Sequence, residues 1–251
     1  MVQLGNEISS GIFAHKFTGG SDTLDGTDEP LYSVQGAKTD SGIGTKTAAQ
    51  NYDYIKTASE DVDAVDSSIK KVLHWAKGGS GSAATISTFF NNMPDAYYDY
   101  AALSFYPFYC YDTVNDANGT SENDATQIVS HLSIRKPWFI AETSYPFSAS
   151  SWVPNDETNF TISSWNTGKT SIVNSYPFTM EGQAHLIHDL TKAVADNKGK
   201  GIFYWEPAWV PNQYVGWAGE GSACSWSNQG FFSYDGKAIN NIKVFDQMRG
   251  S

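Results

Sequence analysis

The sequence predicts an α/β fold built from parallel βα units, of the type that closes into a (β/α)8 TIM barrel. Three observations support this prediction. Apolar runs of strand length alternate with longer stretches in which apolar residues recur every three or four positions. Each run ends in polar or aromatic residues, and long polar insertions follow several of them. The chain has 251 residues, which suffices for one such domain with a sizeable core.

Strand and helix segments can be assigned in order along the chain. Five segments have the composition of strands: residues 1–7, 71–77, 98–107, 136–146 and 200–209. Four segments are predicted to be helices: residues 47–68, 83–93, 125–134 and 180–196. In the last of them Ala184, Ile187, Leu190 and Val194 fall on one helical face. The alternation of the two kinds favours parallel strands joined by helices.

Polar insertions rich in Gly, Ser, Asp and Asn follow the first, third and fourth predicted strands, at about 16–46, 111–124 and 147–179. In a barrel these segments are loops that build the active-site face. Residues 216–245 are aromatic and glycine-rich rather than helical. No repeat or linker divides the chain, so we expect a single domain over residues 1–251. Only five strand signals are present, however, whereas a closed barrel of this type needs eight.

Composition excludes several classes of partner. The formal net charge is −11 and the 16 basic residues are spread thinly, so nucleic acids and anionic membranes are not expected to bind. No apolar run approaches the roughly 18 residues of a membrane span. Eight Trp and 14 Tyr offer rings that can stack on sugars, although each ring could equally pack in the core. Cys110 and Cys224 match no zinc or redox spacing, which leaves one disulfide or two free thiols open.

Two glutamates directly follow apolar strand segments and are candidate catalytic residues. Glu7 follows MVQLGN, and Glu142 follows PWFIA, so both are expected at the carboxyl ends of barrel strands. Glycosidic bond cleavage needs one carboxylic acid and one carboxylate facing each other. A single glutamate at such a position is more often a loop solvator or a helix cap, but two in equivalent positions favour catalysis. Glu206 is a competitor, yet side chains alternate along a strand, so Trp205 and Glu206 should not both point inward.

Six segments occur in an order that is highly specific. They are VQLGNEISSG (2–11), LSFYPF (103–108), FIAETSYPF (139–147), EGQ (181–183), GIFYWEPAWVP (201–211) and SWSNQGFFSYDGKAI (225–239). With these segments the chain resembles the arabinogalactan endo-β-1,4-galactanases of glycoside hydrolase family 53, which belong to a clan of barrel glycosidases. The resemblance covers nearly the whole chain. It implies that Glu7 is the general acid/base and Glu142 the nucleophile, with retention of configuration and carboxyl groups about 5–5.5 Å apart.

The resemblance also implies substrate-binding residues. Asn6 would hydrogen-bond the sugar 2-hydroxyl, with a strand-end cap as the alternative. Trp205 would form the apolar floor under the same sugar, with core packing as its alternative. Tyr106 could orient Glu142. His74 is expected to point to the same carboxyl-terminal end of the barrel if side chains alternate along its strand. For both residues the alternative is packing in the core.

The chain departs from the family pattern at its N-terminal side. Family members carry three further βα units before the acid/base strand, so we expect a barrel truncated to roughly strands 4–8, in a gene fragment, a processed piece or a partial chain. An open five-stranded sheet would have two unpaired edges and an exposed apolar inner face.

These observations yield one principal functional expectation and two alternatives. The principal one is an endo-β-1,4-galactanase acting on pectic galactan or type I arabinogalactan. The alternatives are a remnant that binds the polysaccharide without cleaving it, and a related glycosidase acting on another β-linked hexosan. No metal or organic cofactor is required, although segment 112–124 could hold a structural Ca²⁺. We expect a monomer if the barrel is complete, and secretion is inferred from the resemblance, although no leader segment precedes the first strand.

Overall fold

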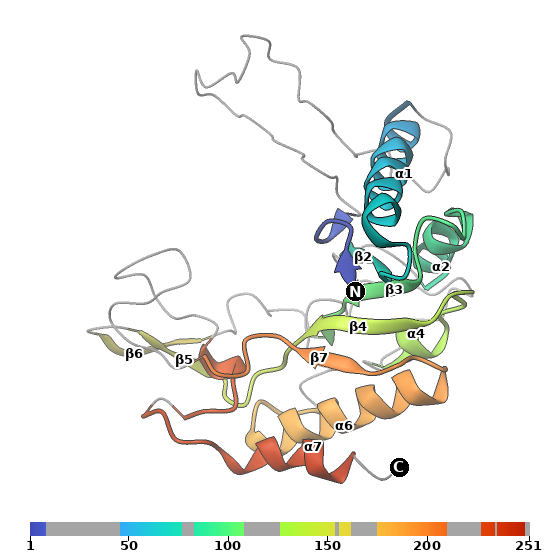
Figure 1. Cartoon of the computed structure of the whole chain (residues 1–251). Coiled ribbons are helices and arrows are strands. Elements are labelled where there is room, and N and C mark those ends of the chain that lie inside the picture. Colours follow the sequence, from blue (N-terminus) through green and yellow to red (C-terminus); the bar gives the residue numbers. More distant parts are fainter. Residues whose placement is uncertain are drawn as a thin grey trace.

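The computed structural model describes residues 1–8, 46–76, 83–107, 126–153, 156–161, 175–209, 227–233 and 235–248. Its main element is a five-stranded sheet in the order β1-β2-β3-β4-β7, and every neighbouring pair is parallel (Figure 1). The strands are β1 (Val2–Gln3), β2 (Lys71–Ala76), β3 (Tyr100–Ser104), β4 (Trp138–Thr143) and β7 (Ile202–Tyr204). Each lies within a predicted strand segment. The fold is an α/β half-barrel, which confirms the predicted class.

The helices also fall where the apolar period predicts them. They are α1 (Lys46–Asp66), α2 (Ala83–Asn92), α4 (Gln127–Ser130) and α6 (Met180–Asp196). Helix α6 begins after Thr179, whose side chain accepts a hydrogen bond from the Gly182 N–H at 3.0 Å. Helix α4 is shorter than predicted. The Asn197 side chain, just after α6, donates to the carbonyls of Val129 and Leu132, and so satisfies backbone groups where α4 ends.

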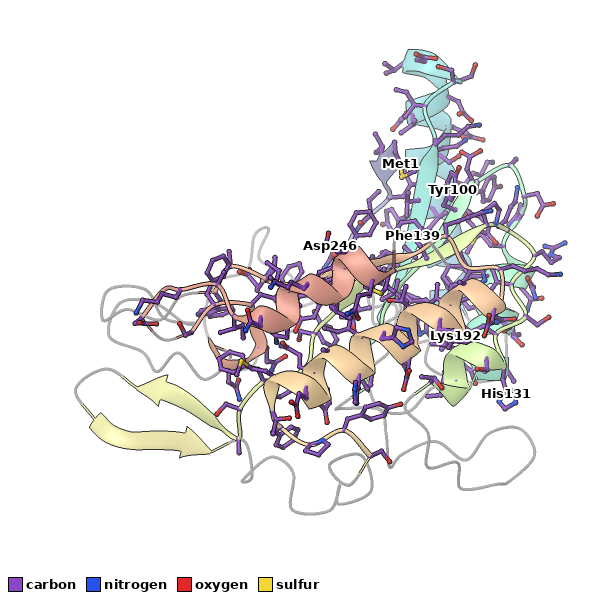
Figure 2. The ribbon with its side chains drawn as sticks, turned by 90° about the horizontal axis from the view of Figure 1, so that it is seen from below. Met1, Tyr100, His131, Phe139, Lys192 and Asp246 are labelled. Carbon is purple, nitrogen blue, oxygen red and sulfur yellow. The ribbon has the colours of Figure 1, made fainter. Side chains whose placement is uncertain are left out.

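The helices pack on one face of the sheet and leave the other face partly open. In β4, Trp138 and Ile140 are buried in the core with residues of the helices, such as Ile55 of α1 and Leu190 of α6. Their neighbour Phe139 points the other way, as strand alternation requires. Its ring meets those of Tyr100 and Phe203, at centroid distances of 6.4 and 5.7 Å. Figure 2 shows α6 and α7 in front of the sheet when it is seen from below, with Tyr100 and Phe139 labelled on neighbouring strands.

One predicted loop contains regular structure. The insertion at 147–179 contains an antiparallel hairpin, β5 (Ser150–Val153) and β6 (Asp156–Thr161), which extends away from the main sheet (Figure 1). Its Thr, Phe and Trp residues favour strands in spite of the polar composition.

Among the described residues of 216–245, only the last two are α-helical, so the segment is mostly not α-helical, as predicted, but it leads into a short helix that the prediction did not include. It contains two 3-10 turns, η4 (Ser227–Gln229) and η5 (Asn240–Lys243), and then α7 (Val244–Gln247). Val244 is buried against Ile187 of α6 and Phe231, and this tertiary contact stabilises a short helix that has no long apolar period of its own.

Within the described residues, β1 and β7 are the edges of the main sheet. Val2 is 40% exposed and Phe203 64% exposed, so apolar side chains reach solvent at both edges, as predicted for an open sheet. None of the described helices combines the length and the apolar character needed to cross a membrane. Cys110, Cys224 and segment 112–124 lie outside the described residues.

Candidate active site

Glu7 lies in a tight turn directly after β1. Gly5 has a φ of 84° and Glu7 itself a φ of 50°, in the left-handed region that side chains other than glycine rarely adopt. Buried Leu4 and Ile8 anchor the turn on either side, and the Leu4 N–H donates to the Val72 carbonyl at 2.8 Å. The fold thus holds Glu7 in a strained conformation, which is common at functional sites.

Glu142 lies near the end of β4 and is only 8% exposed. The Tyr106 hydroxyl donates to its Oε2 at 2.9 Å, and Ser104 on neighbouring β3 is its register partner. Burial raises the pKa of the Glu142 carboxyl, and the negative charge of Glu7 raises it further, while the bonds from Tyr106 and Ser104 act in the opposite direction. The carboxylate is therefore held in place by donors in a partly desolvated position.

The turn after β1 and the end of β4 bring the two glutamates together. A carboxylate oxygen of Glu7, one of Glu142 and a ring nitrogen of His74 all lie within 4.8 Å of one another. An oxygen–oxygen distance of at most 4.8 Å is compatible with the roughly 5–5.5 Å between the carboxyl groups of retaining glycosidases, and it is shorter than the ~6.5–9.5 Å that leave room for water in inverting ones. Such donors could also hold a divalent cation, but both nitrogens of His74 already have protein partners.

His74 lies beneath this pair and is 1% exposed. Its Nε2 is 2.8 Å from the Ser104 hydroxyl, and its Nδ1 is 3.1 Å from Asn6 Oδ1 and 3.0 Å from Gln3 Nε2. Desolvation lowers the pKa of the imidazole, while the charge of Glu7 acts in the other direction. The lowered pKa makes the neutral imidazole the dominant form at neutral pH.

Comparison with known proteins places this arrangement in a family. The model of Glycosyl hydrolase family 53 matches residues 1–245. The chain belongs to this family.

Relatives of this family 53 chain include named galactanases. It is 26% identical over 245 residues to the endo-β-1,4-galactanase of Bacillus subtilis (strain 168), covering 88% of this chain and 52% of that protein. It is 30% identical over 152 residues to the arabinogalactan endo-β-1,4-galactanase of Thermothelomyces thermophilus, covering 60% of this chain and 38% of that protein. The Ignisphaera aggregans GH53 catalytic domain superposes with a TM-score of 0.64 at 26% identity, covering 97% of this chain and 57% of that one. The chain thus spans about half the length of these relatives.

Two predicted site residues of the family 53 chain remain, Asn6 and Trp205. Asn6 is exposed directly before Glu7, and its Oδ1 accepts from Gln3 Nε2 at 3.1 Å. Trp205 follows β7 and is 43% exposed, and its backbone N–H donates to the Thr143 carbonyl at 2.8 Å, one residue after Glu142. An exposed indole is thus available beside the strand that carries Glu142.

Glu206 does not join the cluster of Glu7, His74 and Glu142. It is exposed and has a φ of 51°. The Trp209 N–H donates to its backbone carbonyl at 3.2 Å, so the residue shapes the turn after β7.

Sequence reasoning missed two polar residues in this site, Gln3 and Ser104. Ser104 lies two residues before Tyr106 in an apolar run, and residues two apart share a strand face. Its Cα is the register partner of Glu142. Ser104 could therefore have been predicted from its spacing of two residues from Tyr106 and from its polar side chain in an otherwise apolar run. Gln3 gave a weaker signal, because it lies on a two-residue edge strand.

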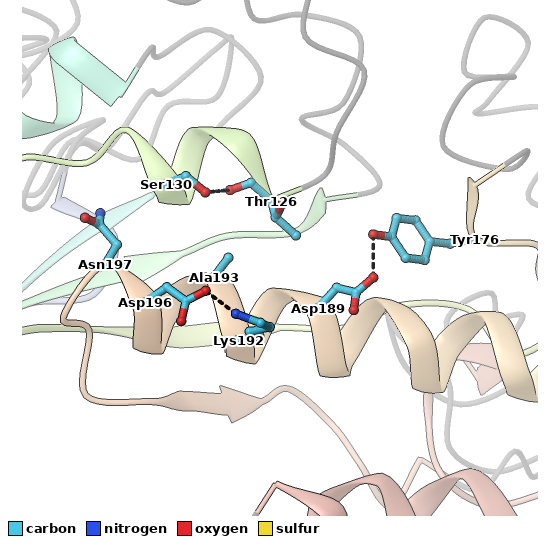
Figure 3. Close-up of a pocket in the computed structure, with 8 residues that line it drawn as sticks. All are labelled: Thr126, Ser130, Tyr176, Asp189, Lys192, Ala193, Asp196 and Asn197. Atoms are coloured by element: carbon cyan, nitrogen blue, oxygen red, sulfur yellow. Dashed lines mark hydrogen bonds and ion pairs between the residues drawn. The ribbon is translucent and has the colours of Figure 1, made fainter. Parts of the chain in front are cut away.

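A hollow of about 390 Å³ lies between α4 and α6, and neither glutamate is among the residues that line it (Figure 3). Its polar groups are largely paired with one another: the Tyr176 hydroxyl donates to Asp189, Lys192 pairs with Asp196, and Ser130 donates to the Thr126 carbonyl. Both carboxylates that line it, Asp189 and Asp196, are paired with other side chains, so the glutamate cluster is the better candidate for catalysis.

Proposed function

We propose that this family 53 chain carries the catalytic centre of an endo-acting, retaining glycoside hydrolase that cleaves β-1,4-galactosidic bonds in pectic galactan or type I arabinogalactan. The observation that supports the chemistry is the approach of Glu7 to Glu142, because one carboxylate oxygen of each residue lies within 4.8 Å of the other. The substrate class follows from the relatives named as galactanases. Residues 1–251 would then act as one catalytic unit.

In the first half of the reaction, Glu7 donates its proton to the glycosidic oxygen as that bond breaks. The ionised Glu142 carboxylate attacks the anomeric carbon and forms a glycosyl ester. The Tyr106 hydroxyl, at 2.9 Å from Oε2, keeps the nucleophile oriented. In the second half, Glu7 removes a proton from water, and the resulting hydroxide attacks the anomeric carbon from the face that the leaving group vacated, which breaks the ester bond to Glu142 on the opposite face. The two inversions restore the starting configuration.

The residues around the pair fit a neutral polysaccharide. Asn6, exposed beside Glu7, would hydrogen-bond the sugar 2-hydroxyl, and the exposed indole of Trp205 would stack under the same ring. A polymer of this kind is met outside the cell, so we propose that the enzyme acts there. The chemistry needs no metal, and a structural Ca²⁺ at segment 112–124 would serve stability alone.

Incubation with β-1,4-galactan tests the proposal. We expect release of reducing ends, with products that first appear in the β configuration by proton NMR. Glu142→Gln should lower the rate by about 10³-fold or more. Glu206→Gln, a matched change of an exposed carboxylate after β7, should leave the rate unchanged.

Two outcomes would contradict the proposal and favour the alternatives. Binding of galactan with no release of reducing ends would indicate a binding remnant. Faster cleavage of mannan or β-glucan than of galactan would indicate a related glycosidase with another substrate.

A further inference from the structure

Beneath Glu142 lies a row of hydrogen-bonded side chains whose protons can be counted. Gln3 Nε2 is 3.0 Å from His74 Nδ1, and His74 Nε2 is 2.8 Å from the hydroxyl of Ser104, which is the register partner of Glu142 on the neighbouring strand. His74 is 1% exposed and Ser104 2% exposed. A serine hydroxyl has one hydrogen and a neutral imidazole has one N–H, so each can donate in one direction only.

Two arrangements of these protons exclude each other. With the imidazole hydrogen on Nε2, His74 donates to Ser104, Ser104 donates to Glu142, and Nδ1 accepts from Gln3. With the hydrogen on Nδ1, His74 donates to Asn6 Oδ1 at 3.1 Å, and the Ser104 hydrogen turns to Nε2. Glu142 then loses one of its donors. The tautomer of His74 thus decides whether Ser104 supports the carboxylate.

The charge of Glu142 selects between the two arrangements. A hydrogen bond that ends on an ionised acceptor is roughly twice as strong as one between neutral groups. The Asn6 oxygen is neutral and already accepts from Gln3 at 3.1 Å. The ionised Glu142 carboxylate is therefore a stronger acceptor than Asn6 Oδ1. This favours the arrangement in which the imidazole hydrogen of His74 lies on Nε2.

We propose that Gln3, His74 and Ser104 are positioning residues that direct one hydrogen bond onto the carboxylate of Glu142, and that the tautomer of His74 follows the charge of that carboxylate. The assignment of Glu142 as the nucleophile rests on the proposed function, but the proton arrangement does not. Loss of the charge, as on formation of the glycosyl ester, favours the Nδ1 tautomer and its bond to Asn6. This change moves one proton within the imidazole and leaves the ring neutral.

The tautomer can be observed without any activity assay. Long-range proton–nitrogen correlation spectra of the full chain, labelled with ¹⁵N, distinguish Nε2–H from Nδ1–H, and His74→Gln identifies the His74 signals among the five histidines. At neutral pH we expect Nε2–H in the unchanged protein and Nδ1–H in Glu142→Gln, where the new amide can donate to Ser104. Nδ1–H in the unchanged protein, or the same tautomer in both proteins, would overturn the proposal.

A kinetic measurement tests the support of the nucleophile. Ser104→Ala removes one donor to the carboxylate, so we expect the acid limb of kcat/KM to move up by about one pH unit and the glycosylation rate to fall about 10- to 100-fold. Ser104→Thr keeps a hydroxyl and should restore the acid limb. Ser87→Ala, in helix α2 with its hydroxyl bonded to the Ala83 carbonyl, is the matched control.

The kinetic and spectroscopic results separate the two proposals. An acid limb that does not move in Ser104→Ala would overturn the positioning role while leaving the galactanase proposal intact. Absence of hydrolysis together with the expected tautomers would overturn the galactanase proposal alone.

Discussion

At the scale of single residues, the site holds the ionised carboxylate of Glu142 in a buried position that disfavours the charged form. Glu142 is 8% exposed and lies within 4.8 Å of a second carboxylate, and both burial and the charge of Glu7 raise its pKa. A group that is ionised for catalysis in such a place lowers the stability of the fold. Function and stability thus oppose each other at this residue, and this conflict can be measured.

Glu142→Gln should be more stable than the unchanged protein at neutral pH. A carboxyl whose pKa is higher in the folded than in the unfolded state contributes stability below the unfolded pKa of about 4.3 and loses it as pH rises through the folded pKa. The neutral amide avoids that loss. We expect a gain on the order of 1 kcal/mol at about pH 7 that disappears below about pH 4, measured by urea unfolding.

The control for this prediction is Glu206→Gln, which changes an exposed carboxylate and should leave unfolding the same at both pH values. A Glu142→Gln protein that is less stable at neutral pH would contradict the argument from burial.

The two glutamates should differ in their dependence on the leaving group. Glu7→Ala removes the proton donor, so hydrolysis of galactan should fall by roughly 10²- to 10⁴-fold. A dinitrophenyl β-galactoside needs no protonation to leave, so its glycosylation step should be nearly unchanged in Glu7→Ala, whereas Glu142→Ala should lose both activities. Burst kinetics measure this step. Equal losses on the two substrates in Glu7→Ala would refute the acid role.

At the scale of elements, one ion pair connects helix α1 to strand β2. Lys71 is 5% exposed, and its Nζ donates to Asp63 at 2.7 Å, to Ser59 at 2.9 Å and to the Ala96 carbonyl at 3.1 Å. Its neighbour Lys70 points to solvent and pairs with Asp99 at 3.3 Å. Strand alternation therefore gives two adjacent lysines very different surroundings.

Lys71→Ala should lower the free energy of unfolding by about 1–3 kcal/mol, because the buried Ser59 hydroxyl loses its donor and the Ala96 carbonyl keeps only the Ser59 hydroxyl, at 3.4 Å. The Asp63 side chain is 41% exposed and can hydrogen-bond water instead of Lys71, which limits the decrease in the free energy of unfolding. Lys70→Ala should change stability by less than about 0.5 kcal/mol, since exposed pairs contribute little. Urea unfolding of both proteins tests this, and equal effects would show that the buried contacts carry no net stability.

At the scale of the whole molecule, the half-barrel exposes apolar side chains at the edges of its sheet. Phe203, on edge strand β7, is 64% exposed and contacts Phe139 on β4. Strand edges with exposed aromatic residues favour pairing with other chains. We therefore expect association to begin at this edge rather than at scattered apolar residues elsewhere.

Phe203→Ser should reduce light scattering of concentrated solutions, at a stability loss of about 1 kcal/mol from the lost ring contact. Val65→Ser is the matched control. Val65 is 82% exposed near the end of α1 and belongs to neither edge strand, so its replacement should not change the scattering. Equal reductions in both variants would show that association depends on total apolar exposure and has no preference for the edge.

The pattern of the sequence was enough to predict the half-barrel and its two candidate glutamates, because apolar period and strand ends are local properties of the chain. The period located α6 over 180–196 without error. The hairpin β5–β6 and helix α7 were missed, since strand propensity was hidden in a polar segment and Val244 becomes helical only with Ile187 and Phe231 as neighbours.

Only the tertiary structure decided which side chains meet. The approach of Glu7, His74 and Glu142 to within 4.8 Å depends on the order and register of parallel strands, including a shift between Leu103 and Ser104 that sets Ser104 beside Glu142. The left-handed backbone at Glu7 is likewise imposed by its buried neighbours. Local residue patterns set which face of a strand a side chain takes, whereas contacts across the sheet depend on how all the strands pack together.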